Sequence, residues 1–502
     1  MIDLSKLRFG APAAERDIGI GLVDYFFESE AYQRMAARQK MIVLGNRGTG
    51  KSAIFKVFAE RARRHGTQVL ELRPEDYSYE LFSSLLKSER EGSWAKQGAF
   101  SAAWKYLIIV LVMKEITRSG PRLKTGAAAK IYEYLRDNFK DAQDTPISVL
   151  VSYLKRIEGF KIGNYEASVK TRELTRLYRL EELEPLLSPM KEVVGKRRVA
   201  VLIDELDKGW DSSEDAKAFV AGLFQASISL NEMSPNFTVY ISLRQELYDS
   251  IPSLYDDAQK YRDIIESIQW DEPALLAVVA NRIRYSVPDL KDAGDSQCWN
   301  SVFAETLQYR STKSFNYMID RTLYRPREII QFCTDALEKS RKQKILPIDY
   351  AVISEAELDY SNAREKDIAA EYRFQYPGLE SVFEVFRGRV YTMERRDLEL
   401  ICLGICTGEL KVSREASWVL EQEPDYLIDL LWHIGFLRAY AVGGLKALRR
   451  SGSSYLGPHQ TSTLNLRTIS RFHVHPMFRS VLGMKEPKKE LERHEVESNP
   501  LS

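Results

Sequence analysis

The sequence predicts an α/β fold with a parallel β-sheet at its core, and the pattern of apolar residues supports this class in three places. Val199–Ile203 and Phe237–Leu243 are largely apolar runs without alternation, as in strands that are covered on both faces. Between them, Glu214–Leu230 has the periodicity of a helix. Met41–Leu44 is a third apolar run, which ends at a glycine and precedes a helical pattern at Ser52–Arg64.

Weaker signals extend this core in both directions. Residues 1–40 predict a loop followed by an amphipathic helix around Leu22–Arg38. Gln68–Leu72 predicts a second strand, and Ser267–Trp270 predicts a last one. A helical region is expected to start at Pro273–Tyr285 and to run to about Ile345.

The composition is that of a soluble globular protein. The 502 residues are 44% hydrophobic and 28% charged, and such a length corresponds to about three domains. Lysine plus arginine (72) nearly equals aspartate plus glutamate (71), so any surface for nucleic acid must be local. Four cysteines favour a reducing compartment. Cys402 and Cys406 are expected to be buried thiols, because no histidine or cysteine cluster lies near them.

The apolar segments are too short to indicate a membrane protein. The start, MIDLSKLRFG, has early charges and no long apolar run, which argues against a signal peptide. Leu107–Met113 is bounded by Lys105 and Lys114, whereas a membrane span needs about 20 apolar residues. We therefore expect a buried helix there and a cytoplasmic protein.

The loop after Met41–Leu44 matches the phosphate-binding pattern G-x-x-x-x-G-K-[ST] at every position. Its glycines let backbone N–H groups point at phosphate oxygens, and the following helix presents its positive N-terminus to the same phosphates. Lys51 is expected to reach the β- and γ-phosphates and to assist catalysis, and Ser52 to bind Mg²⁺. The alternative is an ordinary glycine turn. The predicted nucleotide-binding residues are Gly45, Asn46, Arg47, Gly48, Thr49, Gly50, Lys51, Ser52 and Ala53.

An acidic pair follows the strand at Val199–Ile203, in the sequence VAVLIDE. Asp204 is expected to hold Mg²⁺, usually through water, and Glu205 to act as the general base on the attacking water. Carboxylates at a strand end suit this role because phosphates lie at the carboxyl edge of such a sheet. The alternative is a surface turn after a core strand. Asp207 is more simply a cap for the next turn.

Two arginines lie at the ends of predicted elements, and from there they could contact a γ-phosphate. Arg244 follows the strand Phe237–Leu243 and could stabilise charge in the transition state. Arg327 stands at the start of the helix Glu328–Ser340, where Pro326 suits a first turn. The alternatives are an exposed loop arginine and a surface arginine pair, respectively. Arg47 is expected to point away from phosphate, where it could meet a neighbouring subunit.

The expected nucleotide is ATP. A GTPase would carry an Asn/Thr-Lys-x-Asp motif after a later strand, and the sequence has none.

The C-terminal third has a different order of elements. Three short helices are followed by two strands with a Gly/Ser/Thr-rich loop between them, which is the order of a winged helix. The helices are predicted at Leu398–Ile405, Ala416–Glu421 and Tyr426–His433, and the strands at Phe436–Val442 and Arg471–His475.

The segment 75–195 is predicted to be a helical insertion, because the core needs far fewer residues between its first and third strands. It has helical periods at Trp104–Arg118, Ala127–Phe139 and Ile147–Ile157. The predicted divisions are an ATPase core at 1–74 and 196–270, the insertion at 75–195, a helical lid at 271–365, a winged-helix-like domain at 366–485 and a disordered tail at 486–502.

Four segments in this order resemble the motifs of AAA+ and STAND-type P-loop ATPases: GNRGTGKS, VAVLIDELD, YISLR and YRPREII. The sequence also resembles bacterial P-loop ATPases with an FG-x-P-x-x-ER-D stretch, here Phe9–Asp17, and an F-x-V-H-P strand, here Phe472–Pro476. The resemblance implies an ASCE-type core with Glu205 catalytic and Arg244 and Arg327 as sensor-like residues. STAND-type proteins act as nucleotide switches in signalling, and many bacterial ones in defence against phage. The long insertion departs from the simple pattern.

The C-terminal region could bind DNA or protein. Residues 430–485 contain no acidic residue and eight basic ones, which could meet a phosphate backbone. These are Arg438, Lys446, Arg449, Arg450, Arg467, Arg471, Arg479 and Lys485. However, the candidate recognition helix, Tyr426–Gly435, is mostly apolar, which favours a protein-docking or autoinhibitory module over non-specific DNA contact through 438–471. His473 and His475 share a strand face but are too few to indicate a metal site.

The sequence thus favours a slow, Mg²⁺-dependent ATPase that works as a regulatory switch, with a separately encoded protein effector and ATP-dependent oligomerisation as expected features. The alternative is a DNA-handling ATPase related in mode to origin-recognition or transposition regulators. A scaffold with a degraded nucleotide site is disfavoured by intact Lys51, Ser52, Asp204 and Glu205.

Overall fold

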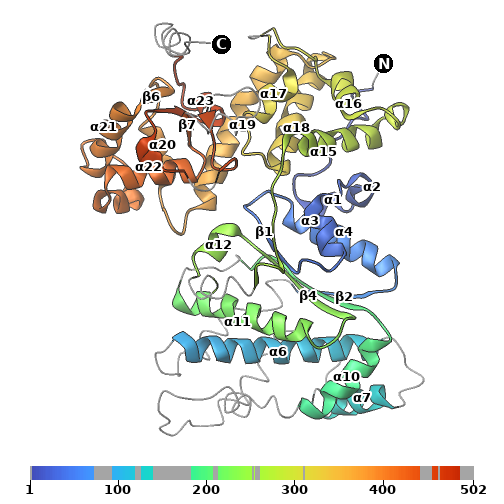
Figure 1. Ribbon diagram of the computed structural model, residues 1–502. Coiled ribbons are helices and arrows are strands. Elements are labelled where there is room, and N and C mark those ends of the chain that lie inside the picture. The colour runs from blue at the N-terminus through green and yellow to red at the C-terminus, as the bar shows by residue number, and fades with distance from the viewer. Residues whose placement is uncertain are drawn as a thin grey trace, which may run out of the picture. The chain divides into compact units, whose positions relative to one another are not determined.

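The computed structural model (Figure 1) describes residues 3–72, 93–118, 126–138, 183–206, 213–251, 254, 261–308, 311–440, 455–461 and 464–486. The chain divides into two compact units. We call Glu28–Ile268 the sheet unit, and Met1–Phe27 with Gln269–Ser502 the helical unit. The sequence predicts residues 1–27 as part of the ATPase core, together with the sheet. In the structure, the contacts of these residues place them in the helical unit.

The sheet unit contains a five-stranded sheet in which every neighbouring pair of strands is parallel. Its strands are β1 (Ile42–Leu44), β2 (Gln68–Leu72), β3 (Val199–Ile203), β4 (Phe237–Leu243) and β5 (Ile265–Ser267). Their spatial order is β2-β3-β4-β1-β5, so β4 lies between β1 and β3. The three central strands are buried throughout, as expected from their apolar composition. The predicted α/β class with a parallel sheet is therefore confirmed, although the last strand ends at Ser267 and not at Trp270.

Helices precede and connect the strands of this sheet. They include α3 (Glu30–Ala36), α4 (Lys51–Arg64), α10 (Glu184–Gly195), α11 (Glu214–Asn231) and α12 (Gln245–Asp249). The predicted helix at Leu22–Arg38 is wrong in its continuity, because it is split into α2 (Leu22–Tyr25) and α3. Phe26 is extended at ψ 130°, and the Ser29 hydroxyl accepts a hydrogen bond from the Tyr32 N–H, which starts a new helix.

The predicted insertion contributes helices to the same hydrophobic core as the sheet. Its described helices are α6 (Ser93–Arg118), α7 (Ala127–Asn138) and α10. The helix predicted at Ile147–Ile157 lies outside the described residues. Helix α6 runs along α11 (Figure 1), and the apolar stretch Leu107–Met113 is buried in that core. No helix in the described part of the chain is long and apolar enough to cross a membrane.

Gly222 marks the closest approach of α6 to α11. A Cβ atom at Gly222 would lie 2.6 Å from the Phe100 Cβ and 2.8 Å from the backbone nitrogen of Ser101. The absence of a side chain therefore lets the two helices pack backbone against backbone.

The helical unit begins with α1 (Ala14–Asp17) and α2 and continues after the sheet unit. Its further helices are α15 (Glu272–Ser286), α16 (Asp295–Val302), α17 (Ser314–Ile319), α18 (Pro326–Gln343), α19 (Tyr350–Glu371) and α20 (Leu379–Glu384). The buried Asp17 carboxylate joins the N-terminal segment to α15: it accepts from the Tyr25 hydroxyl at 2.7 Å and from the Arg282 guanidinium at 3.1 Å.

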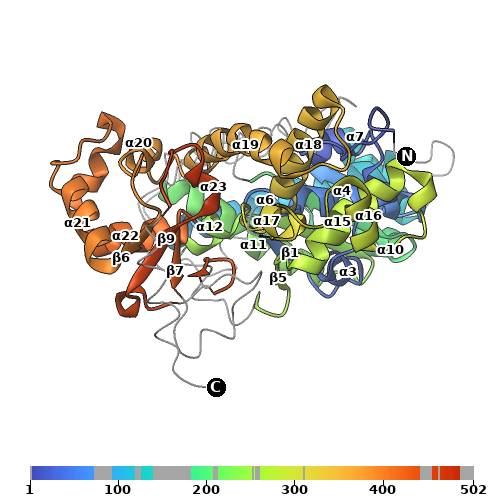
Figure 2. The same cartoon turned by 90° about the horizontal axis from the view of Figure 1, so that it is seen from above.

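The last part of the helical unit combines short helices with a four-stranded antiparallel sheet of order β6-β9-β7-β8 (Figure 2). Its elements are β6 (Thr392–Glu394), α21 (Arg395–Cys406), a 3₁₀ helix (Arg414–Glu421), α22 (Pro424–His433), β7 (Leu437–Tyr440), β8 (Tyr455–Leu456), β9 (Arg471–Val474) and α23 (Pro476–Arg479). The order expected from the sequence is present with two additions: β6 lies in front, and β8 lies in the stretch predicted to be a loop. Residues 441–454 lie outside the described residues. Cys402 and Cys406 are buried, as expected.

The α6–α11 contact generates a prediction about stability. Alanine normally stabilises a helix over glycine by about 1 kcal/mol. At Gly222 we expect the opposite, because the new methyl group meets the α6 backbone, and overpacking costs about 1–3 kcal/mol. Urea unfolding of Gly222→Ala should therefore show a lower midpoint. Gly195→Ala is the matched control, since a Cβ there meets nothing within 4 Å and should leave stability unchanged or raise it. Equal midpoints for both variants would contradict the packing argument.

Candidate nucleotide-binding site

The parallel pairing of β1, β3 and β4 brings their carboxyl ends to one edge of the sheet. Leu44 at the end of β1 pairs with Leu243 at the end of β4, and Ile203 at the end of β3 pairs with Ile241. The chain leaves β1 into the glycine-rich loop, β3 into Asp204 and Glu205, and β4 into Arg244. The site residues predicted from these three segments therefore meet at one edge.

The glycine-rich loop is tightly curled. Gly48 and Gly50 have φ angles of 84° and 96°, in the left-handed region that favours glycine. A Cβ atom at Gly45 would lie 2.5 Å from the Thr49 Oγ1, which itself donates to the Asn46 carbonyl at 2.8 Å. The loop can therefore close on itself only with glycine at these positions.

Helix α4 starts at Lys51, directly after the loop. Its N-cap residue, Gly50, provides no side-chain cap, and the first turn contains no acidic residue. An anion at this N-terminus would meet backbone N–H donors and the positive end of the helix dipole. The Lys51 ammonium donates to the carbonyls of Gly45 at 2.6 Å and Asn46 at 3.0 Å, so it lies over the mouth of the loop. Ser52 follows in the first turn.

The acidic pair after β3 has an unusual backbone. Glu205 has a φ of 61°, which is rare for a residue other than glycine, and its N–H donates to the Asp204 Oδ1 at 2.9 Å. Both side chains are half-exposed, whereas the strand before them is fully buried. Backbone strain of this kind gathers at functional sites. The pair is therefore accessible and held in a defined conformation. This suits the expected roles of Asp204 as a metal ligand and Glu205 as a general base.

Ser242, in β4, is not among the site residues predicted from the sequence, whereas the nearby Arg244 is. It pairs with Val43 and stands one position beyond Ile241, the partner of Ile203. The side chain is 1% exposed, and its hydroxyl has no hydrogen-bond partner within the described ranges. Buried polar groups are almost always paired, so this hydroxyl is a candidate for contact with a ligand or its water. This lack of a partner among the described residues is visible only in the tertiary structure.

The two candidate sensor arginines lie in different units. Arg244 is the N-cap of α12 in the sheet unit and is half-buried. Arg327 lies in the first turn of α18 in the helical unit, where its Nε donates to the Pro12 carbonyl at 3.2 Å. Its neighbour Arg325 is buried and donates to Glu371 at 2.8 Å, so it is committed to the core. Of that pair, Arg327 is the accessible one.

Three of the five basic residues that the structure describes in 430–485 are at least partly buried and contact other side chains. Arg438 is buried and contacts Asp320 Oδ1 at 2.5 Å, Arg471 contacts Glu394 at 2.9 Å, and Arg479 lies 3.8 Å from the centre of the Tyr391 ring. Among the five basic residues of this segment that the structure describes, only Arg467 and Lys485 are exposed.

The remaining candidates of this region are also used for packing. Helix α22 buries most of its apolar residues, as a packing helix does. Burial and neighbouring arginines hold the pKa values of His473 and His475 well below the ordinary value, so both imidazoles are neutral. The His475 Nδ1 accepts from the Met477 N–H at 3.1 Å, which caps α23.

Comparison with known proteins gives partial matches. A sequence profile described as the FunZ-associated C-terminal helical domain matches residues 273–369, which extend from α15 into α19. The chain is 23% identical over 481 residues to the "Putative transposon gamma-delta 80.3 kDa protein" of Escherichia coli (strain K12), covering 94% of this chain and 66% of that protein. It is 26% identical over 120 residues to "Allergen Alt a 2" of Alternaria alternata, covering 24% of this chain and 62% of that protein. The chain thus spans just under two thirds of these relatives' lengths.

Among solved structures, the Aeropyrum pernix ORC2 protein, in its ADPNP–ADP complexes, matches 94% of this chain and 95% of its own. The TM-score is 0.29 and the sequence identity 10%.

A substitution at Ser242 tests whether its buried hydroxyl is unsatisfied. Ser242→Ala removes a buried hydroxyl that has no hydrogen-bond partner among the residues placed in the structure, and it leaves only a small space. Because an unsatisfied buried group costs about 1–3 kcal/mol, we expect this variant to be as stable as the parent or more stable in urea unfolding. Ser227→Ala is the control, since the buried Ser227 hydroxyl donates to the Phe224 carbonyl at 2.8 Å. A clear loss of stability in Ser242→Ala would mean that its hydroxyl is satisfied.

Proposed function

We propose that this protein binds ATP with Mg²⁺ at the loop Gly45–Ser52 and hydrolyses it slowly as a regulatory switch. The observation that carries the proposal is the meeting of the curled loop and the pair Asp204–Glu205 at one edge of a parallel sheet. The intervening strand β4 supports an ASCE-type arrangement, in which a further strand separates the loop from the acidic pair.

The loop residues fit a triphosphate. The positive-φ glycines and the uncapped N-terminus of α4 provide backbone donors, and Lys51 adds a charge over the loop. Ser52 and Asp204 would hold Mg²⁺, which supplies charge neutralisation at the β- and γ-phosphates when bound. Thr49 and Ala53 lie beside these residues, and Arg47 is a half-buried residue of the loop.

The residues beyond the loop take the chemical roles in this proposal. Glu205 accepts a proton from the attacking water, and the Ser242 hydroxyl orients that water or the γ-phosphate. Arg244 stabilises the charge of the transition state from the end of β4. Arg327, in the helical unit, is the second sensor-like residue of this proposal.

The proposal also assigns roles to the helical and C-terminal regions. The region 271–365 serves as a helical lid, and 366–485 serves as a winged-helix-like module that docks a protein. The protein is cytoplasmic and acts in signalling or defence through a separate effector. The packing character of α22 and the internal use of Arg438, Arg471 and Arg479 support docking of protein over DNA. ATP-dependent oligomerisation is part of this switch.

A DNA-handling ATPase is the second candidate. It is favoured by the similarity to a protein named for a transposon, and by the exposed Arg467 and Lys485. Lys446, Arg449 and Arg450 would add charge in the segment 441–454. In this version the C-terminal module contacts a phosphate backbone, and DNA raises ATP turnover.

Glu205→Gln and Lys51→Ala should separate binding from chemistry. We expect Glu205→Gln to bind ATP like the parent and to lose about 100-fold or more in phosphate release, because the general base is lost. Lys51→Ala should lose both binding and turnover, since it removes the charge over the loop. Binding is measured with a fluorescent ATP analogue and turnover by phosphate release. Parent-like turnover in Glu205→Gln would remove Glu205 from this role.

Charge reversal tests the choice between protein and DNA. Under the switch proposal, Arg449→Glu with Arg450→Glu leaves duplex affinity and ATP turnover unchanged in a salt titration. Arg414→Glu, which changes an exposed arginine outside 430–485, is the matched control and should change neither quantity. A steep salt dependence of duplex binding in the parent that is lost in the double variant would favour the DNA-handling ATPase instead.

A further inference from the structure

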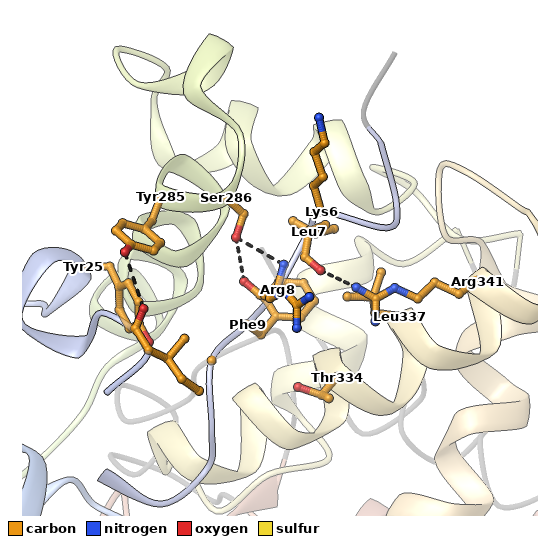
Figure 3. A pocket seen from close by; sticks show the side chains of 12 residues that line it. Lys6, Leu7, Arg8, Phe9, Tyr25, Tyr285, Ser286, Thr334, Leu337 and Arg341 are labelled. Atoms are coloured by element: carbon orange, nitrogen blue, oxygen red, sulfur yellow. Dashed lines mark hydrogen bonds between the residues drawn. The ribbon is translucent and has the colours of Figure 1, made fainter. Parts of the chain in front are cut away.

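The helical unit contains an open cavity of about 600 Å³ that lies outside the proposed nucleotide site (Figure 3). It is formed by the N-terminal segment 6–10, by Ile20 and Tyr25, and by side chains from α15 and α18. All of these residues belong to the helical unit. Cavities of about 300–1,000 Å³ are typical of sites for small molecules.

Every charged side chain that lines this cavity is basic: Lys6, Arg8 and Arg341. Lys6 has a long contact with Asp3 at 4.0 Å, where both side chains are largely exposed. Arg8 forms no ion pair among the residues that the structure describes, and Arg341 contacts carbonyl groups rather than a carboxylate. The nearby Asp17 does not offset this charge, because Arg282 and Tyr25 already contact it. The cavity is therefore suited to an anion.

The two arginines are carried on a fixed backbone. The Ser286 hydroxyl accepts from the Arg8 N–H at 3.1 Å and donates to the Arg8 carbonyl at 2.9 Å. Arg341 donates to the carbonyls of Leu4 at 2.9 Å and Leu7 at 2.5 Å, which uses two of its five N–H donors. In Figure 3 Arg8 lies between Ser286 and Arg341. Such pre-organisation lowers the entropy cost of binding a ligand.

The opposite side of the cavity is aromatic. The Tyr285 ring is 50% exposed and meets the buried Tyr25 edge to face, with ring centroids 5.0 Å apart. Its hydroxyl contacts the Ile20 carbonyl at 3.4 Å, and Ile20 itself is 45% exposed. An exposed, anchored tyrosine ring can pack against a planar group such as a nucleobase. The cavity thus joins an anion-binding side to a side for a flat ring.

We propose that this cavity binds a nucleotide, with its phosphates at Arg8 and Arg341 and its base against Tyr285. The site is independent of the loop Gly45–Ser52, because none of its lining residues belongs to the sheet unit. It gives the helical unit its own means of responding to a phosphorylated nucleoside.

The test uses the full-length chain with Lys51→Ala, in EDTA, so that binding at the phosphate loop is weakened. Calorimetry with ADP, pyrophosphate and adenosine measures the whole ligand and its two halves. We expect ADP to bind more tightly than either half. Arg8→Gln should weaken ADP and pyrophosphate by about ten- to hundredfold, as expected for a lost charged hydrogen bond. Arg414→Gln, which changes an exposed arginine elsewhere in the same unit, should change neither.

Tyr285→Leu separates the two halves of the proposal. It should weaken ADP and adenosine and leave pyrophosphate unchanged, and a thermal melt checks that the variant folds. Equal ADP affinity in the Arg8→Gln and parental backgrounds would overturn the site, as would the absence of ADP and pyrophosphate binding at millimolar concentration. Equal affinity for pyrophosphate and ADP, with no effect of Tyr285→Leu, would overturn the nucleotide assignment.

Discussion

The candidate nucleotide site depends on the parallel pairing of β4 with both β1 and β3. This pairing is the only connection in the sheet between the strand before the glycine-rich loop and the strand before Asp204. Because all three strands are parallel, their carboxyl ends meet at one edge. Loss of register in β4 would move Ser242 and Arg244 away from the acidic pair, so the buried apolar faces of β4 hold the site's geometry as well as the core.

The helical unit is held by a different kind of interaction. Carbonyl groups of the N-terminal segment are bound by arginines of α15 and α18: Arg282 contacts Phe9, Arg327 contacts Pro12, and Arg341 contacts Leu4 and Leu7. Since the segment has little regular structure, these bonds replace those of a helix or strand. The same bonds fix Phe9–Asp17, so this sequence signature has a structural role in the helical unit, beside the proposed cavity.

The C-terminal part shows how burial changes the meaning of a charge. Arg438 is buried against Asp320, and although burial alone would raise the pKa of Asp320, Arg438 outweighs it and lowers that pKa. The pair joins β7 to the end of α17, and removing one partner would leave a buried charge unpaired. An arginine in this position contributes to stability and offers little to a nucleic acid, so Arg438 adds no positive charge to an exposed surface.

The sequence by itself determined the α/β class, the bounds of β2, β3 and β4, and the pattern of the glycine-rich loop, because an apolar run or a glycine spacing is a local property. Only the tertiary structure decided what depends on residues far apart in the chain. It placed residues 1–27 with the helical unit, broke the helix at Phe26–Ser29 and made α6 part of the sheet's core. It also left the Ser242 hydroxyl without a hydrogen-bond partner in the described residues and enclosed Arg438. Burial and pairing of a side chain are set by its neighbours in space, which a pattern along the chain does not record.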